Sequence, residues 1–229
     1  WKRLDIHTEQ TAHMIAGDGN PAMAFNSGVD LTTYVAHDLG GSFMNGRLVM
    51  QVDLCAPLRW VSGGSGRLRA ILAGDRFLEG NLTDTSEGCS QWWATGVGFD
   101  SGKIAAYRGA SGETAGAWET SSATAEPGHW YRFVVTTDLD EEWSGVTVYD
   151  MGTEQPAITT KMPAAGTSVA TFARLPLRRP MDELGGVSCV VVATRATEFS
   201  NTTEENGPRA KLDNLIVSHN PPGLVLSFR

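Results

Sequence analysis

Seven of the 229 residues are tryptophan, the side chain whose flat face best holds a ring-shaped ligand. Sugar rings stack on such faces, which offer a large apolar area at a low cost in conformational entropy. Trp92 and Trp93 are adjacent in a strand-like run, so they should point to opposite faces of a sheet. Trp143 lies in a polar connection, where we expect it to be exposed. Any single tryptophan is better explained by core packing, and a ligand platform within the set stays an open alternative.

Arg67 and Arg69 form a second candidate group, together with Tyr107. The two arginines alternate along one strand-like run, so their side chains share a face. Outward arginines on a solvent-exposed sheet explain the same spacing, so ligand binding and plain solvation stay alternatives. The candidate carbohydrate-binding residues are therefore Arg67, Arg69, Trp92, Trp93, Tyr107 and Trp143.

The three cysteines lack the spacing of a zinc site, and no G-x-S-x-G nucleophile motif is present. Cys189 lies in an apolar run that predicts a buried strand, where a small thiol packs as a hydrophobic side chain. Cys55 ends a strand and Cys89 lies in a polar loop. If a disulfide forms, we expect it to join Cys55 to Cys89.

Strands must position these residues. Residues 130–137 and 145–150 predict a hairpin, 187–194 a central strand and 211–218 a closing strand. Further strand-like runs are 47–54, 66–72, 92–99 and 103–108, with 157–161 as a possible continuation of the sheet edge. Proline interrupts residues 171–184, where we expect at most one or two helical turns.

Short strands separated by glycine and proline predict an all-β fold, a two-sheet antiparallel β-sandwich of the jelly-roll kind. Residues 1–220 form a single domain in this interpretation, and 221–229 form a terminal strand or a linker stub. A formal net charge of −8 argues against nucleic acid as a partner, and no apolar run is long enough for membrane insertion. The start at Trp1 suggests a segment of a longer chain.

Two segments resemble the concanavalin A-like lectin/glucanase superfamily, in its laminin G-like bacterial branch. The first runs from Gly128-His129-Trp130-Tyr131 into the hairpin that ends in Val148-Tyr149-Asp150. The second is the closing Leu212-Asp213-Asn214-Leu215. The resemblance covers about a quarter of the chain and implies a concanavalin A-like jelly roll. That superfamily contains lectins and other binding modules, glycoside hydrolases, polysaccharide lyases and adhesive domains, so the fold alone does not give the function.

The resemblance also implies a structural Ca²⁺ ion. Asp213 matches the acidic position of the closing strand, and Asp18, between two glycines, is the expected partner ligand. An ordinary hydrogen-bonded strand residue at Asp213 and an ordinary loop residue at Asp18 are the alternatives.

Three functions follow as hypotheses. The first is a non-catalytic recognition domain of a secreted or cell-surface bacterial protein, with a glycan or polysaccharide as partner, located outside the cell, in the periplasm or on the cell surface. The second is a carbohydrate-active enzyme. The Glu-x-Asp-x-x-Glu strand of the glucanases is absent, and so are the R-x-E-x-R and Q-x-H strands of the lyases, whose base is Tyr or His beside Arg. The third is a structural or adhesive domain without a small ligand.

Overall fold

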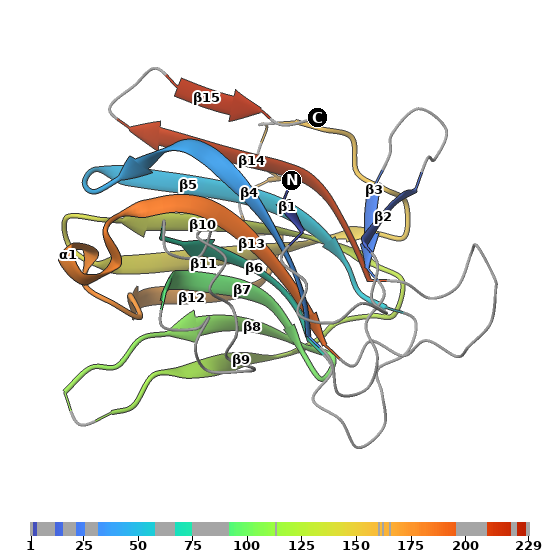
Figure 1. The fold of residues 1–229 in the computed structure, drawn as a ribbon. Helices are drawn as coiled ribbons and strands as arrows, with labels where there is room; N and C mark the ends of the chain where they lie inside the picture. The colour runs from blue at the N-terminus through green and yellow to red at the C-terminus, as the bar shows by residue number, and fades with distance from the viewer. Residues whose placement is uncertain are drawn as a thin grey trace.

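The computed structural model describes residues 2–3, 12–15, 22–25, 32–57, 67–74, 92–112, 114–159, 161, 163–164, 166–195, 210–220 and 224–227. Two antiparallel sheets pack face to face over these residues (Figure 1). The result confirms the predicted all-β sandwich. In the described part of the chain, no helix has the length and apolar character needed to span a bilayer.

The seven-stranded sheet has the order β1-β4-β13-β6-β7-β8-β9. Its strands are β1 (Lys2–Arg3), β4 (Thr32–Phe43), β6 (Arg67–Ala73), β7 (Trp93–Asp100), β8 (Lys103–Arg108), β9 (Ala117–Thr124) and β13 (Val187–Arg195). β13 lies between β4 and β6, so the predicted central strand is confirmed.

The eight-stranded sheet has the order β12-β11-β10-β5-β14-β3-β2, and β15 pairs with β14. Its strands are β2 (Ala12–Ile15), β3 (Ala22–Phe25), β5 (Arg47–Cys55), β10 (Trp130–Asp138), β11 (Trp143–Gly152), β12 (Ser168–Pro176), β14 (Ala210–Asn220) and β15 (Leu224–Ser227). β10 and β11 pair along their whole length, and this confirms the predicted hairpin.

The core fills the space between the inner faces of the two sheets. Alternation along β5 turns Leu48, Met50, Val52 and Leu54 inward, and none of them is exposed. The Phe99 ring of β7 reaches across, with centroids 5.5 Å from those of Tyr131 and of Phe133 on β10, both edge to face. Full burial of such side chains stabilises the fold by about 1.5–3 kcal/mol each.

One strand was missed, and one local prediction is wrong. The sequence did not predict the edge strand β12, residues 168–176; Pro176 is the last residue of this edge strand and costs no ladder hydrogen bond there. The single turn of helix α1 (Met181–Leu184) follows it, in agreement with prediction. Residues 157–159 do not continue the sheet edge; this segment crosses the outer face of the eight-stranded sheet.

The cysteine sulfurs lie where small apolar atoms are expected. Cys189 is fully buried in β13, in agreement with prediction, and its thiol lies 3.6 Å from the carbonyl oxygen of Ala73. Cys55 is the last residue of β5, and burial raises the pKa of its thiol to about 11. Cys89, its expected disulfide partner, lies outside the described residues, so the pairing stays a prediction.

Candidate functional site

The outer face of the seven-stranded sheet is apolar at its centre, which is unusual for a sheet face that does not contact the main core. A second cluster of buried residues covers it, separate from the core between the sheets. Its members are Tyr34, Ala36, Ile71, Ala73, Trp93, Cys189, Val191 and Ala193, with Trp92 and Trp118 packed against them. This second cluster provides the base on which the aromatic rings described next are held.

Three aromatic residues from adjacent strands meet on this outer face, and we call them the aromatic triad: Trp93 of β7, Tyr107 of β8 and Trp118 of β9. The ring centroids of Trp93 lie 6.3 Å from those of Tyr107 and of Trp118, and those of Tyr107 and Trp118 are 5.5 Å apart. All three pairs are edge to face, the arrangement that aromatic quadrupoles favour. Each ring therefore fixes the orientation of the other two.

A glycine of β7 leaves the space that the Trp118 ring occupies. A Cβ atom at Gly96 would lie 3.0 Å from the ring of Trp118 and 3.1 Å from the side chain of Ile71. Both contacts are tighter than most side-chain contacts, so a larger residue at this position would require the Trp118 ring or Ile71 to shift by a few tenths of an ångström.

Arg69 of β6 stacks on the triad. Its guanidinium carbon lies 3.7 Å from the centroid of the Trp118 ring, and its Nη2 donates to Oδ2 of Asp100 at 3.1 Å. Only 5% of Arg69 is exposed. Burial and, to a smaller extent, the neighbouring charge of Arg67 lower the pKa of this guanidinium to about 9, although Asp100 opposes the shift. At neutral pH Arg69 is therefore a buried cation with one carboxylate partner.

A second arginine reaches the triad from the segment after β12. The backbone amide of Arg178 donates to the carbonyl oxygen of Ala94 at 2.8 Å, which anchors this segment to β7. The Arg178 guanidinium donates to the Tyr107 hydroxyl and lies 5.0 Å from the Tyr107 ring and 5.7 Å from the Trp93 ring. Aromatic rings, a hydroxyl and two guanidinium groups thus converge on one face.

Three buried N–H groups on this face have no hydrogen-bond partner among the described residues: Nε of Arg67, Nε of Arg69 and the indole Nε1 of Trp93. A buried polar group without a partner costs about 1–3 kcal/mol, so native structures rarely leave one without a reason. All three groups are donors only, so each of them lacks an acceptor.

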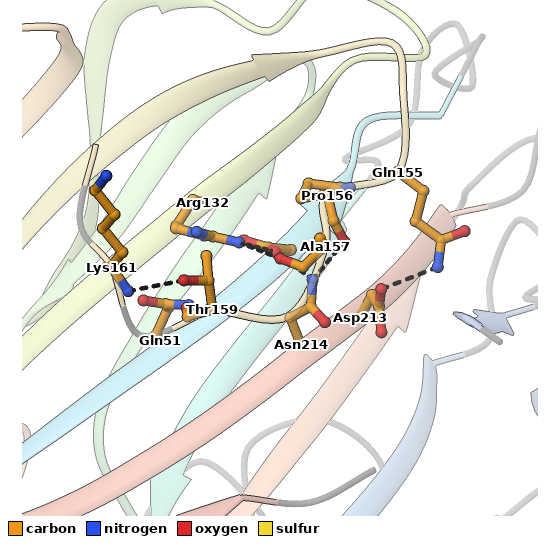
Figure 2. Close-up of polar contacts among 10 residues, drawn as sticks. Gln51, Arg132, Gln155, Pro156, Ala157, Thr159, Lys161, Asp213 and Asn214 are labelled. Carbon is orange, nitrogen blue, oxygen red and sulfur yellow. Dashed lines mark hydrogen bonds and ion pairs between the residues drawn. The ribbon is translucent and has the colours of Figure 1, made fainter. Parts of the chain in front are cut away.

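The outer face of the eight-stranded sheet is organised differently, as Figure 2 shows. Arg132 of β10 makes two hydrogen bonds to Asp53 of β5, from Nε at 2.8 Å and from Nη2 at 2.7 Å. Asn214 of β14 donates to Asp53 Oδ2 and to the carbonyl oxygen of Pro156, both at 2.8 Å. Residues 155–159 cover this pair, and Arg132 and Asp53 are 1% and 0% exposed.

Asp213, the predicted calcium ligand, lies beside this network. Its Oδ2 accepts a hydrogen bond from Gln155 Nε2 at 2.9 Å (Figure 2). The described residues contain no group of three or more His, Cys, Asp or Glu side chains placed to hold a metal ion. Asp18 lies outside the described residues. Calcium at Asp213 stays a prediction that depends on ligands from elsewhere in the chain.

The structure brings four of the six predicted carbohydrate-binding residues onto one face: Arg67, Arg69, Trp93 and Tyr107. Trp92 precedes β7 rather than lying within it, so the predicted opposition to Trp93 does not apply. Trp143 begins β11 instead of lying in a loop, and alternation with the buried Ser144 places it on the outer face of the other sheet.

Sequence reasoning did not select Trp118 or Arg178. Trp118 comes from a strand, β9, that the sequence left as part of a long connection. Arg178 lies between two prolines, a setting in which spacing predicts nothing about direction. Both converge on the triad only through the tertiary fold.

No family model matches the chain, and no curated protein matches its sequence. Among solved structures, lectin II from Ulex europaeus is similar with a TM-score of 0.50 and 10% identity, over 92% of this chain and 91% of that one. Peanut lectin gives a TM-score of 0.49 and 11% identity, over 90% of this chain and 87% of that one. An endo-1,3-beta-glucanase from Streptomyces sioyaensis gives a TM-score of 0.48 and 14% identity, over 87% of this chain and 76% of that one.

Proposed function

We propose that this chain, which has the concanavalin A-like jelly-roll fold, is a non-catalytic domain that binds a glycan on the outer face of its seven-stranded sheet. The observation that carries the proposal is the aromatic triad with Arg69 and Arg178 around it. Fold likeness to a lectin does not by itself establish binding, so the argument rests on these side chains. The same proposal places the domain in a secreted or cell-surface bacterial protein.

The chemistry of the face suits a sugar. Trp118, the partly exposed member of a triad whose rings pack edge to face, offers rigid apolar surface to the C–H face of a pyranose, and little entropy is lost when a ligand binds. Guanidinium groups beside the rings offer paired donors to adjacent hydroxyl or acid oxygens. A few fixed polar groups around an apolar surface are the usual composition of a small-ligand site.

The test compares Trp118→Ala with a matched control, Trp143→Ala, on the outer face of the other sheet. Titration calorimetry against a panel of soluble polysaccharides should show a ligand whose affinity falls by about tenfold or more in Trp118→Ala and stays unchanged in Trp143→Ala. Melting curves check that both variants fold. If the wild-type chain binds no polysaccharide, or if both variants bind alike, the proposal fails.

A second candidate function is polysaccharide lyase, because Arg178 donates a hydrogen bond to the Tyr107 hydroxyl. In that reaction Tyr107, as its phenolate, takes the proton next to a uronate carboxylate that an arginine neutralises. The bond to the glycosidic oxygen breaks as a C=C bond forms, and Tyr107 returns the proton to the leaving oxygen. Ultraviolet absorbance of the unsaturated product would reveal turnover, and Tyr107→Phe should abolish it. Binding without turnover by the wild-type chain favours the recognition domain.

We keep the structural calcium ion at Asp213 as part of the proposal. Its support is the resemblance of the closing strand, together with the position of the Asp213 carboxylate, which accepts a hydrogen bond from Gln155. Ca²⁺ bound only by the folded state would stabilise it by about 2.7 kcal/mol at a hundredfold excess over the dissociation constant. Melting curves with EDTA and with added calcium, repeated for Asp213→Ala, decide the matter. Equal melting temperatures for the wild-type chain in both conditions reject it.

A further inference from the structure

We infer that the glycan bound on this face is acidic, and that a carboxylate or sulfate group of the ligand accepts hydrogen bonds from Arg69 and Arg67. This inference rests on the proposed function, and it adds the chemical class of the ligand. A carboxylate is a planar oxyanion and a sulfate is a tetrahedral one, and the oxygen atoms of either match the paired N–H donors of a guanidinium.

The charge on the face supports an anionic ligand. Arg67, Arg69 and Arg178 place three cations at or beside the triad, and Asp100 is the carboxylate that pairs with Arg69. The chain as a whole carries a formal charge of −8, so this concentration of arginine runs against its average composition. An excess of positive charge in a poorly solvated place attracts oxyanions more strongly than the same charge in water.

The buried donors without partners also indicate an anionic ligand. Nε of Arg69 is buried without a partner among the described residues, and so are Nε of Arg67 and the indole N–H of Trp93. A sugar hydroxyl that accepts from such a donor brings its own proton, which then needs an acceptor. A carboxylate or sulfate accepts only, and therefore matches these three unpartnered donors.

Arg69 is also held in place before any ligand arrives. Stacking on Trp118 and the bond from Nη2 to Asp100 fix the plane of the guanidinium, because the two contacts act on its face and on one of its edges. The unpartnered Nε belongs to a group that loses little side-chain freedom when it binds. Preorganisation of this kind raises affinity without new contacts.

The test uses matched polysaccharides that differ only in the acid group: polygalacturonate against its carboxyl-reduced form, and a sulfated galactan against its desulfated form. The wild-type chain should bind one acidic member about tenfold or more tightly than its neutral partner, with affinity that falls as salt is added. Binding of the uronate alone assigns a carboxylate, and binding of the sulfated galactan alone assigns a sulfate ester.

Arg67→Gln, at a half-buried position, should reduce binding of the acidic polymer, and Arg69→Gln should reduce it further. Arg47→Gln, at an exposed position in the other sheet, is the matched control and should bind as the wild type does. Equal affinity for acidic and neutral members overturns the inference but leaves glycan binding intact. If the chain binds no polysaccharide of the panel, acidic or neutral, the proposed function is rejected as well.

Discussion

The outer faces of the two sheets each carry an arginine paired with an aspartate, but the two pairs differ in how completely they are satisfied. Arg132 makes two short bonds to Asp53 and reaches the carbonyl oxygen of Ala157, while Asn214 completes the carboxylate. Arg69 makes one bond to Asp100, whose side chain is 23% exposed. Its Nε lacks a partner among the described residues.

The difference indicates that an arginine–aspartate pair has one role on one sheet and another role on the other. A buried ion pair is tolerated when every donor and acceptor is matched, and it then specifies which segments pack together. The Asp53 pair meets that condition and fastens residues 155–159 to β5, β10 and β14. The Asp100 pair leaves buried donors without acceptors among the described residues, and in our proposal a ligand supplies these acceptors.

We call Arg132–Asp53 the closed pair and Arg69–Asp100 the open pair, and their sheet faces the closed and the open face. The largest expected effect on stability is at the closed pair. Arg132→Met should lower the free energy of unfolding by about 3–5 kcal/mol, because it leaves the Asp53 carboxylate buried without its cation. Urea denaturation followed by tryptophan fluorescence measures it. Combining Arg132→Met with Asp53→Leu should recover most of the loss, since no unpaired charge then remains. A double variant as unstable as the single one contradicts this account.

The amide that completes the closed pair comes next. Asn214→Ala removes two buried hydrogen bonds and places alanine at a φ of 49°, so we expect a loss of about 2–3 kcal/mol in unfolding free energy. Asn214→Gly loses the same bonds but accepts the backbone conformation, and it should lose less. If the alanine and glycine variants are equally stable, the left-handed backbone contributes nothing.

The open pair should respond in the opposite way. Arg69→Met keeps most of the packing on Trp118, removes an incompletely satisfied cation and should change unfolding free energy by only about 1 kcal/mol. Ligand affinity should nevertheless fall sharply. A destabilisation as large as that of Arg132→Met would show that Arg69 is structural, and the contrast between the two faces would disappear.

The smallest effect on stability is expected at the exposed ion pair of Arg47 with Asp138. Asp138 accepts from the Glu141 backbone amide, which lowers its carboxyl pKa, and its bond to Arg47 lowers it further. This contribution, under about 1 kcal/mol, is present above the unfolded pKa and is lost as the pH falls through the lower folded pKa. Asp138→Asn should therefore match the wild type in stability at low pH and fall slightly below it at neutral pH. A constant difference across the titration contradicts the assignment.

The sequence predicted the contents of the open face better than those of the closed one. Alternation along β6 correctly places Arg67 and Arg69 on one side, because a strand repeats every two residues. The same alternation puts Asp53 on the polar side of β5, where solvent is the ordinary expectation, yet the side chain is fully buried. Its cover comes from residues 155–159, which lie about a hundred positions away and make irregular contacts.

β12 escaped prediction for a local reason. Ala170 and Phe172 alternate inward, but Arg174 adopts a φ of 49° and the register shifts before Leu175. A bulge of this kind breaks the period on which strand prediction depends. The same segment leads to Arg178, so the missed strand also concealed a component of the candidate site.

The glycine beneath Trp118 carries an evolutionary consequence. Since a Cβ atom at position 96 would lie 3.0 Å from the indole at position 118, glycine at 96 is the residue that leaves this ring its full space. Descendants of a common ancestor that retain tryptophan at 118 should retain glycine at 96, and those that abandon the ring should be released to accept larger residues there. Joint retention of these two residues in an alignment of homologues would then mark the lineages that kept this surface.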